Sequence, residues 1–357
     1  MAQLTIVDID PNLKQKLAAP EDTVFYNALA APFTLYGLPQ GSEAPLCRLP
    51  KELFDKCTPA VQSLSFHTAG GRIRFATDAR TIHFAVKLYE KCLFPHMPLT
   101  GTSGLDLYCG DVWCSSVRPY FGSDQTPKEE YHGSVELPGE GMREVSVYLP
   151  LYNGIRSISI GLAPEAKVAP DRGYDFGGKP VLFYGSSITQ GGCACRTSTC
   201  YTALVTRWLN VDHINLGFSG NGRGEDYMAE YIASLDLAAF VMDYDHNAPN
   251  AEHLKNTHEA FYKIIRHAKP DLPILMMSKP DFVPGKNESE ERREIIRTTY
   301  EKALAAGDKK VWYIDGETLL EGRERAACTV DGCHPNDLGF YRMALKVEPV
   351  LREMLDI

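Results

Sequence analysis

The sequence predicts two domains of different fold class. Residues 1–165 are expected to form an antiparallel β-sandwich of jelly-roll type, because short alternating runs are separated there by Gly, Pro and Asp. Residues 180–357 are expected to form a three-layer, flavodoxin-like α/β domain, because short apolar runs alternate there with helical patterns. A chain of 357 residues is also long for a single core. Residues 166–179, with glycines, a proline and little periodicity, are the expected linker.

The expected strands of the first domain are runs in which apolar and polar side chains alternate. Such alternation is typical of strands with one face buried and one face in solvent. The runs are 63–67, 72–76, 81–88, 133–137, 144–149 and 155–162.

The second domain is expected to contain a parallel sheet of five strands with helices on both faces. Its strands are short and mostly apolar, as strands buried on both sides are. The expected strands are 181–185, 214–217, 238–244, 273–278 and 310–315, and the expected helices are 199–210, 224–234, 251–268, 288–306 and 337–355.

The composition and net charge of the chain disfavour some classes of binding partner. A hydrophobic fraction of 44% and a charged fraction of 23% are those of a soluble globular protein. The net charge of −9 argues against nucleic acid and against an anionic membrane surface as partners. The first residues lack the pattern of a signal peptide, and no run approaches the ~20 apolar residues of a membrane span, so a cytoplasmic location is expected. The ten cysteines are then expected to be reduced.

The first expected strand of the α/β domain leads directly into Gly185-Ser186-Ser187. A serine at this point lies at the carboxyl edge of the sheet, where open α/β folds bind their ligands. Ser187 is therefore a candidate nucleophile. The alternative is an ordinary strand-to-loop turn, in which glycine and serine are common.

The second candidate is the pair formed by Asp331 and His334. A serine hydroxyl needs a base to remove its proton, and a carboxylate bonded to the far ring nitrogen of histidine fixes the tautomer of that base. The three-residue spacing lets a tight loop aim both side chains at one place. The alternative is that Asp331 caps the last helix and His334 simply lies on a loop.

Candidate oxyanion donors follow the first three expected strands. The N–H groups of Ser187 and Gly220 and the side-chain amide of Asn247 all fall at the same sheet edge. Taken singly, Gly220 and Asn247 are equally compatible with turns. Their joint occurrence with a nucleophile and a base favours a catalytic site.

Gly185-Ser186-Ser187-Ile188-Thr189, Gly220, Asn247 and Asp331-x-x-His334 together resemble the four blocks of SGNH (GDSL-type) hydrolases. The resemblance implies that Ser187 is the nucleophile, His334 the base and Asp331 its orienting acid, with Gly220 and Asn247 completing the oxyanion hole. Gly104-Leu105-Asp106-Leu107-Tyr108 is similar to the Gly-x-Asp-Leu-Tyr signature of a β-domain that precedes one branch of the family. The branch implies an esterase for small acyl groups, and its two-domain relatives include carbohydrate deacetylases.

Two positions depart from the common family pattern. Ser186 stands where the family usually has Asp, and Asp245-His246-Asn247-Ala248 stands where it has Gly-x-Asn-Asp. Neither departure removes a catalytic atom. Both bear on the substrate class and on the shape of the oxyanion loop.

The remaining candidates are polar side chains near these motifs. Arg196, Asp106 and Tyr108 are candidate substrate contacts, with a surface arginine and structural strand-edge residues as the alternatives. His246 is a weaker candidate base than His334.

A metal site and a cofactor are not expected. Cys193, Cys195, Cys200 and Cys333 are candidate zinc ligands, but their spacing does not match the usual ligand pairs.

The sequence therefore predicts a serine esterase that removes a short acyl group, with acetyl favoured, from a small-molecule or carbohydrate ester. One alternative is a carbohydrate-binding protein with a catalytically silent hydrolase fold. Another is an acyl thioesterase that uses the same residues.

Overall fold

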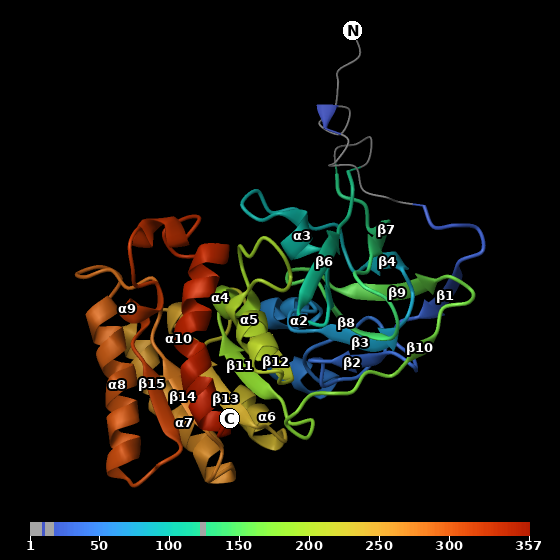
Figure 1. The fold of residues 1–357 in the computed structure, drawn as a ribbon. Coiled ribbons are helices and arrows are strands. Elements are labelled where there is room, and N and C mark those ends of the chain that lie inside the picture. The colour runs from blue at the N-terminus through green and yellow to red at the C-terminus, as the bar shows by residue number, and fades with distance from the viewer. Residues whose placement is uncertain (1–8, 11–17, 122–125) are drawn as a thin grey trace.

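The chain folds into two parts that lie side by side (Figure 1). In this computed structural model, residues 9–10, 18–121 and 126–357 are described. The antiparallel sheets, blue to green in the figure, occupy one side, and the α/β part, green to red, occupies the other. None of the helices in these described ranges has the length and hydrophobicity needed to cross a membrane.

The second part contains the expected parallel sheet of five strands. Strand β11 (Val181–Gly185) lies between β12 (His213–Gly217) and β13 (Ala239–Asp243), followed by β14 (Ile274–Met277) and β15 (Val311–Ile314). The order β12-β11-β13-β14-β15 is that of flavodoxin-like domains, which place their ligands at the carboxyl ends of the strands. The predicted fold class is confirmed.

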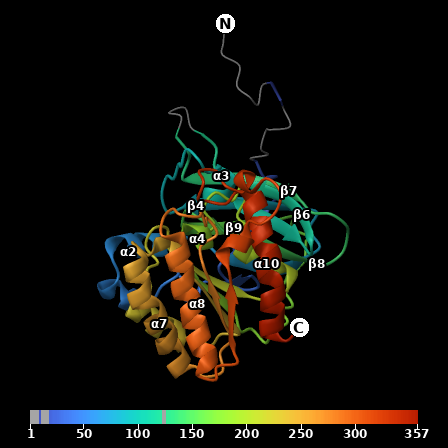
Figure 2. The same cartoon turned by 90° about the vertical axis from the view of Figure 1, so that its left-hand side faces the viewer.

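Helices cover both faces of this sheet (Figure 2). On one face, α5 (Tyr201–Trp208) and α10 (Asp337–Leu355) pack against one set of strand side chains. On the other face lie α6 (Asp226–Ser234), α7 (Ala251–Ala268) and α8 (Ser289–Ala305). Alternate residues of each strand enter the two cores, as the period of two in a strand requires.

The first part consists of two antiparallel sheets around a third core. Neighbouring strands in each sheet are hydrogen-bonded to one another. One sheet has the order β1 (Val24–Asn27), β9 (Ile155–Leu162), β4 (Thr81–Leu88), β7 (Glu130–Glu136), and the other has β10 (Val168–Ala169), β3 (Arg72–Thr77), β8 (Arg143–Tyr148), β5 (Leu105–Cys109), β6 (Val112–Val117), with β2 (Thr34–Tyr36) also pairing with β3.

One predicted strand of this part is wrong. Residues 63–67 belong mostly to the helix α2 (Pro59–Ser65), not to a strand. Thr58 caps the helix by accepting a hydrogen bond from the N–H of Val61, and Pro59 occupies the first helical position, which proline favours. These start signals outweigh the apolar–polar alternation of the five residues that follow.

Several short elements escaped the sequence patterns. β10 lies inside the expected linker and pairs with β3, so the chain stays attached to the β-part until residue 169. The strands β1, β2, β5 and β6 were also missed. So were the loop helices η2 (Lys51–Lys56), α3 (Leu99–Thr102), α4 (Ser187–Gln190), η3 (Asp245–Asn247), α9 (Gly316–Leu319) and η4 (Arg325–Cys328). Three of these, α3, α4 and η3, lie at loops that matter for the site.

A buried arginine joins the two parts. Arg48 is fully buried and donates hydrogen bonds to the carbonyls of Asn215 (2.9 Å), Gly217 (2.7 Å) and Leu64 (2.7 Å). Its guanidinium carbon also lies 4.7 Å from the centre of the Phe218 ring. Burial lowers the pKa of Arg48 to about 10, which still leaves the guanidinium charged at neutral pH. The carboxyl end of β12 and the residue that follows it are therefore held by a charge from the β-part.

A second buried arginine acts at the opposite end of β12. Arg72, on β3, pairs with the carboxylate of Asp212 and contacts the imidazole of His213. Desolvation lowers the pKa of His213 well below its ordinary value, and the charge of Arg72 adds to this effect, so the imidazole is neutral beside the guanidinium.

We expect Arg48→Met to lower the free energy of unfolding by about 2–4 kcal/mol, because three buried carbonyls would lose a charged donor. Urea unfolding followed by circular dichroism measures the change. Lys56→Met is the matched control, since Lys56 joins the same segment to α6 only through an exposed ion pair of 3.8 Å with Glu230. Such a pair contributes about 0–1 kcal/mol. Equal losses in the two variants would contradict the importance of the buried contacts.

Candidate active site

Ser187 begins the short helix α4 directly after β11. Ser186 caps this helix: its hydroxyl accepts from the N–H of Ile188 at 3.1 Å, and Thr189 Oγ1 accepts from the Ser186 N–H at 3.1 Å. Gly185 cannot carry a side chain, because a Cβ there would lie 2.2 Å from the carbonyl oxygen of Asp243. The turn therefore presents Ser187 at the carboxyl edge of the sheet with a fixed backbone.

A buried carboxylate supports this turn from below. Asp243, the last residue of β13, accepts hydrogen bonds from Tyr201 Oη (2.6 Å) and Thr189 Oγ1 (2.9 Å). Burial raises the pKa of Asp243 to about 7, although the hydrogen bonds from Tyr201 and Thr189 counteract that rise. Asp243 and Tyr201 were missed by the sequence motifs, because both belong to regular elements and carry no signature of their own.

The structure brings Ser187, His334 and Asp331 together in one line of hydrogen bonds. Ser187 Oγ lies 2.9 Å from His334 Nε2, and His334 Nδ1 lies 2.7 Å from Asp331 Oδ2. The second carboxylate oxygen of Asp331 accepts from the backbone N–H of His334 (2.7 Å) and of Cys333 (3.0 Å). Asp331 thus orients both the imidazole and the loop that carries it.

These contacts shift two pKa values in opposite directions. A hydrogen bond with Cys333 is the largest cause that raises the pKa of His334 to about 9; burial opposes the rise, and Asp331 adds to it. Burial alone would raise the pKa of Asp331, but hydrogen bonds from His334 and Cys333 outweigh it and lower that pKa to about 2. At neutral pH Asp331 is therefore ionised, as an orienting carboxylate must be.

The two other predicted loops are tied to each other. Asn247 lies on η3 and donates from Nδ2 to the carbonyl of Phe218 at 2.9 Å. An amide NH₂ has two hydrogens, so one of them remains for a ligand. Gly220 follows Phe218 in a turn and has φ +68°, the left-handed conformation that favours glycine. The loop with Gly220 and the loop with Asn247 are thus held in a fixed position relative to each other.

Gln190 connects these loops to the β-part, a role that the motifs did not reveal. Its Oε1 accepts from the N–H of Ser219 at 3.0 Å, beside Gly220. Its Nε2 donates to the carbonyl of Leu151 at 2.9 Å and lies 3.0 Å from His67 Nδ1. One fully buried side chain at the end of α4 therefore bridges both parts of the molecule.

Aromatic residues of the first part stand next to the serine and histidine. Tyr152 Oη donates to the carbonyl of Ser187 at 3.3 Å, and the ring of His96 lies 6.4 Å from the ring of His334. Phe94 packs between them, with ring centres 5.6 Å from Tyr152 and 6.1 Å from His96. Since these residues lie far from the motifs in sequence, only the fold could reveal them.

The three residues predicted to contact substrate, Asp106, Tyr108 and Arg196, lie in another region of the interface between the two parts. Asp106 is fully buried and accepts from Trp113 Nε1 (2.6 Å), and Arg196 Nη1 lies 3.5 Å from its other oxygen. Tyr108 is stacked under the guanidinium of Arg207, 4.3 Å from the ring centre. These side chains already have protein partners, and a substrate contact for them stays a prediction.

Two groups of side chains in the described ranges have the residue types of a metal site. They are His246, Asp281 and Cys333, and Asp331, Cys333 and His334. In each group the imidazole uses its two nitrogens for two different protein partners, so the side chains are already bonded to one another. Of the four cysteines considered as candidate zinc ligands, Cys333 alone belongs to these two groups of described residues.

Two family models divide the sequence between them. The model of the GDSL-like lipase/acylhydrolase family matches residues 178–352. The model of the N-terminus of SGNH-hydrolase-type esterases, named for the motif Gly-x-Asp-Leu-Tyr, matches residues 23–168. The chain belongs to the SGNH (GDSL-type) hydrolases. It is accordingly a hydrolase of ester bonds.

Solved structures similar to this SGNH hydrolase extend over both of its parts. A GDSL-like lipase from Bacteroides ovatus has 28% identity and a TM-score of 0.81, with 94% of this chain and 98% of that chain covered. A salicylyl-acyltransferase from a tetracycline biosynthetic pathway has 19% identity and a TM-score of 0.77, with the same coverage. An acetyl xylan esterase from Butyrivibrio proteoclasticus has 12% identity and a TM-score of 0.58, covering 94% and 99%. The comparison with curated proteins found no match.

Proposed function

We propose that this SGNH hydrolase is a serine esterase that removes a short acyl group, acetyl in particular, from a carbohydrate ester. The observation that carries the proposal is the line of hydrogen bonds from Ser187 through His334 to Asp331. A hydroxyl, an imidazole and a carboxylate in this order are the parts needed to activate a serine nucleophile.

The reaction follows from these positions. Neutral His334 accepts the proton of Ser187 as Oγ attacks the ester carbonyl, and Asp331 stabilises the imidazolium that forms. The N–H groups of Ser187 and Gly220 and the free amide hydrogen of Asn247 stabilise the oxyanion. His334 then protonates the leaving alcohol, and it activates the water that hydrolyses the acyl-enzyme.

The walls beside the serine favour a small acyl group. Ser187 is only 3% exposed. A Cβ at Gly192 would lie 2.8 Å from Tyr152 Oη, 3.0 Å from the Ser187 carbonyl oxygen and 3.5 Å from His334 Cδ2. There is thus little free space between the nucleophile helix, the base and the β-part.

The carbohydrate part of the proposal draws on relatives of the same fold. One similar structure is named an acetyl xylan esterase, and others are named family two carbohydrate esterases, including one from Cellvibrio japonicus. The polar and aromatic groups of His96, Phe94 and Tyr152 beside the base are of the kind that contact sugars.

We expect Ser187→Ala and His334→Ala to abolish hydrolysis of p-nitrophenyl acetate and of acetylated oligosaccharides, because each removes a reacting group. Asn247→Ala should lower kcat by about 10²–10³, the usual effect of losing one oxyanion donor. Steady-state kinetics measure these changes, with Lys255→Ala, on the exposed face of α7, as a control. Full activity of Ser187→Ala would contradict the proposal. Glycan binding without labelling of Ser187 by a fluorophosphonate would instead favour a binding protein.

Acyl length is expected to matter strongly. With p-nitrophenyl esters of two to eight carbons, we expect kcat/KM to fall as the acyl chain lengthens, because Tyr152 and the backbone at Gly192 limit the space. Gly192→Ala should lower activity even toward acetate. A rate that rises with chain length would contradict the acetyl assignment, and a preference for acyl-CoA would indicate a thioesterase.

The pH dependence tests the role of His334. Only the neutral imidazole accepts the serine proton, so kcat/KM should rise with pH toward about 9, the raised pKa of His334. Since Cys333 is the largest cause of that rise, Cys333→Ala should move the midpoint to lower pH. Cys195→Ala is the control and should leave the midpoint in place. An identical midpoint in Cys333→Ala would show that the thiol does not act on His334.

A further inference from the structure

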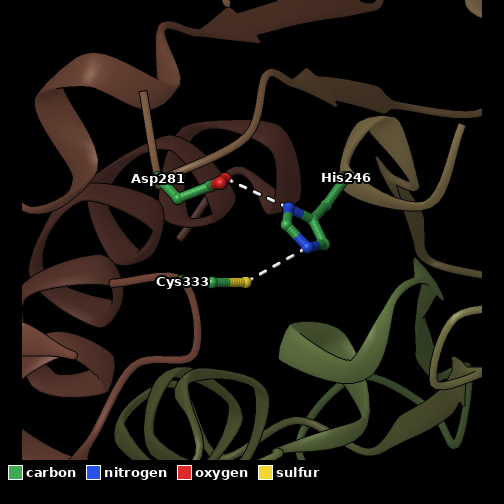
Figure 3. A group of neighbouring side chains, drawn as sticks. All are labelled: His246, Asp281 and Cys333. Carbon is green, nitrogen blue, oxygen red and sulfur yellow. Dashed lines mark hydrogen bonds and ion pairs between the residues drawn. The ribbon is translucent and has the colours of Figure 1, made fainter. Parts of the chain in front are cut away.

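A second line of hydrogen bonds joins Cys333, His246 and Asp281 (Figure 3). Cys333 Sγ lies 3.1 Å from His246 Nε2, and His246 Nδ1 lies 3.1 Å from Asp281 Oδ1. The order thiol–imidazole–carboxylate matches the order hydroxyl–imidazole–carboxylate of Ser187, His334 and Asp331. The ester hydrolysis described above uses none of Cys333, His246 and Asp281 as a reacting group.

Three loops at the same sheet edge bring this second group together. His246 lies on η3 after β13, Asp281 lies in the loop after β14, and Cys333 precedes α10. Asp281 is 8% exposed, and Lys279 Nζ lies 3.7 Å from its second oxygen. The carboxylate is therefore fixed by a cation on one side and by the imidazole on the other.

The group lies close enough to the serine site to affect it. The rings of His246 and His334 are 6.4 Å apart. Cys333 is next to His334 in sequence, and the residue is partly exposed.

We propose that Cys333, His246 and Asp281 form a second nucleophilic site, in which a thiolate is held for reaction with small electrophiles such as hydroperoxides and alkylating agents. The thiol proton resides on His246, whose imidazolium is stabilised by Asp281. The thiolate, not the thiol, is the reactive form of cysteine.

The pKa values agree with this ion pair. Burial alone would lower the pKa of His246, but the hydrogen bonds with Asp281 and Cys333 outweigh it and raise the pKa to about 10. Burial alone would raise the pKa of Cys333, but hydrogen bonds from His246 and His334 outweigh it and lower the pKa. A cysteine beside a histidinium is the arrangement that activates thiols elsewhere.

The arrangement differs from that of a metal centre. The two ring nitrogens of an imidazole point in different directions, and here one faces the carboxylate and the other the thiol. A single ion can bind only one of the two ring nitrogens. An ion at Nε2 would lie beside Cys333 and on the side of the ring away from Asp281, and an ion at Nδ1 would lie beside Asp281 and away from Cys333. Structural zinc needs four ligands around one point.

The chemistry balances without any further group. With a hydroperoxide, Sγ attacks one peroxide oxygen, the S–O bond forms and the O–O bond breaks. The departing oxygen takes the proton from His246 and leaves as water or an alcohol, while the sulfur is oxidised by two electrons to the sulfenic acid. With iodoacetamide, the C–S bond forms as iodide leaves, and His246 later gives its proton to water.

The test is the rate at which iodoacetamide labels each cysteine of the whole protein at pH 6, read by mass spectrometry of peptides. Cys195 is the internal control. The residue as a whole is exposed, but partial desolvation of its thiol and a hydrogen bond with Asp337 raise the pKa of the thiol to about 11. We expect Cys333 to be labelled at least ~10-fold faster than Cys195, because reactivity follows the thiolate fraction. His246→Gln and Asp281→Asn should slow the labelling of Cys333 and leave that of Cys195 unchanged.

Labelling and esterase activity are measured on the same samples. The loss of esterase activity rests on the proposed function, whereas the labelling of Cys333 does not. Activity should fall in step with labelling of Cys333, and whatever activity Cys333→Ala retains should resist the reagent. Hydrogen peroxide should add one oxygen to Cys333, reversibly with dithiothreitol. Ser187→Ala should be labelled at Cys333 as fast as the wild type, so a failed esterase assay leaves this proposal testable. Labelling of Cys333 no faster than Cys195, or one bound zinc per chain, would overturn it.

Discussion

The convergence of parallel strands on one sheet edge is the constraint on which the site depends. β11, β13 and β14 each end at that edge, and the loops that follow them carry Ser187, Asn247 and Asp281. The segment between β15 and α10 adds the loop with Asp331, Cys333 and His334. Residues separated by 147 positions in sequence therefore meet within hydrogen-bonding distance. No local motif could achieve this, because a strand places only its own terminal residue at the edge.

The β-part contributes to the site through buried polar contacts and not through a flexible tether. Arg48 holds the carbonyls of Asn215 and Gly217, and Gln190 receives support from Leu151 and His67 while it fixes Ser219. Buried polar groups are costly unless all are paired, so these contacts favour one relative placement of the two parts. The loop with Gly220 is thus positioned from both sides of the interface.

The sequence predicted regular elements well and short or buried ones poorly. The bounds expected for α7 and α10 are those observed, because long amphipathic patterns leave little ambiguity. Residues 63–67 were assigned to a strand, because five residues of alternation also fit one face of α2. The Ser, His and Asp positions were predictable, since their spacing matches a family. Arg48, Gln190 and Tyr152 were not, because their roles depend on contacts with distant segments.

The neighbouring thiol has two opposite consequences for the serine site. In the reaction proposed above, a negative sulfur beside His334 stabilises the imidazolium that forms when Ser187 attacks, which favours the transition state. The same charge raises the pKa of the resting base, which lowers the fraction of neutral His334 at a given pH. His246 limits both effects, because its own positive charge, fixed by Asp281, partly neutralises the sulfur. Whether Cys333 assists or slows the enzyme at a given pH thus depends on how the proton is shared between two imidazoles on either side of one sulfur atom.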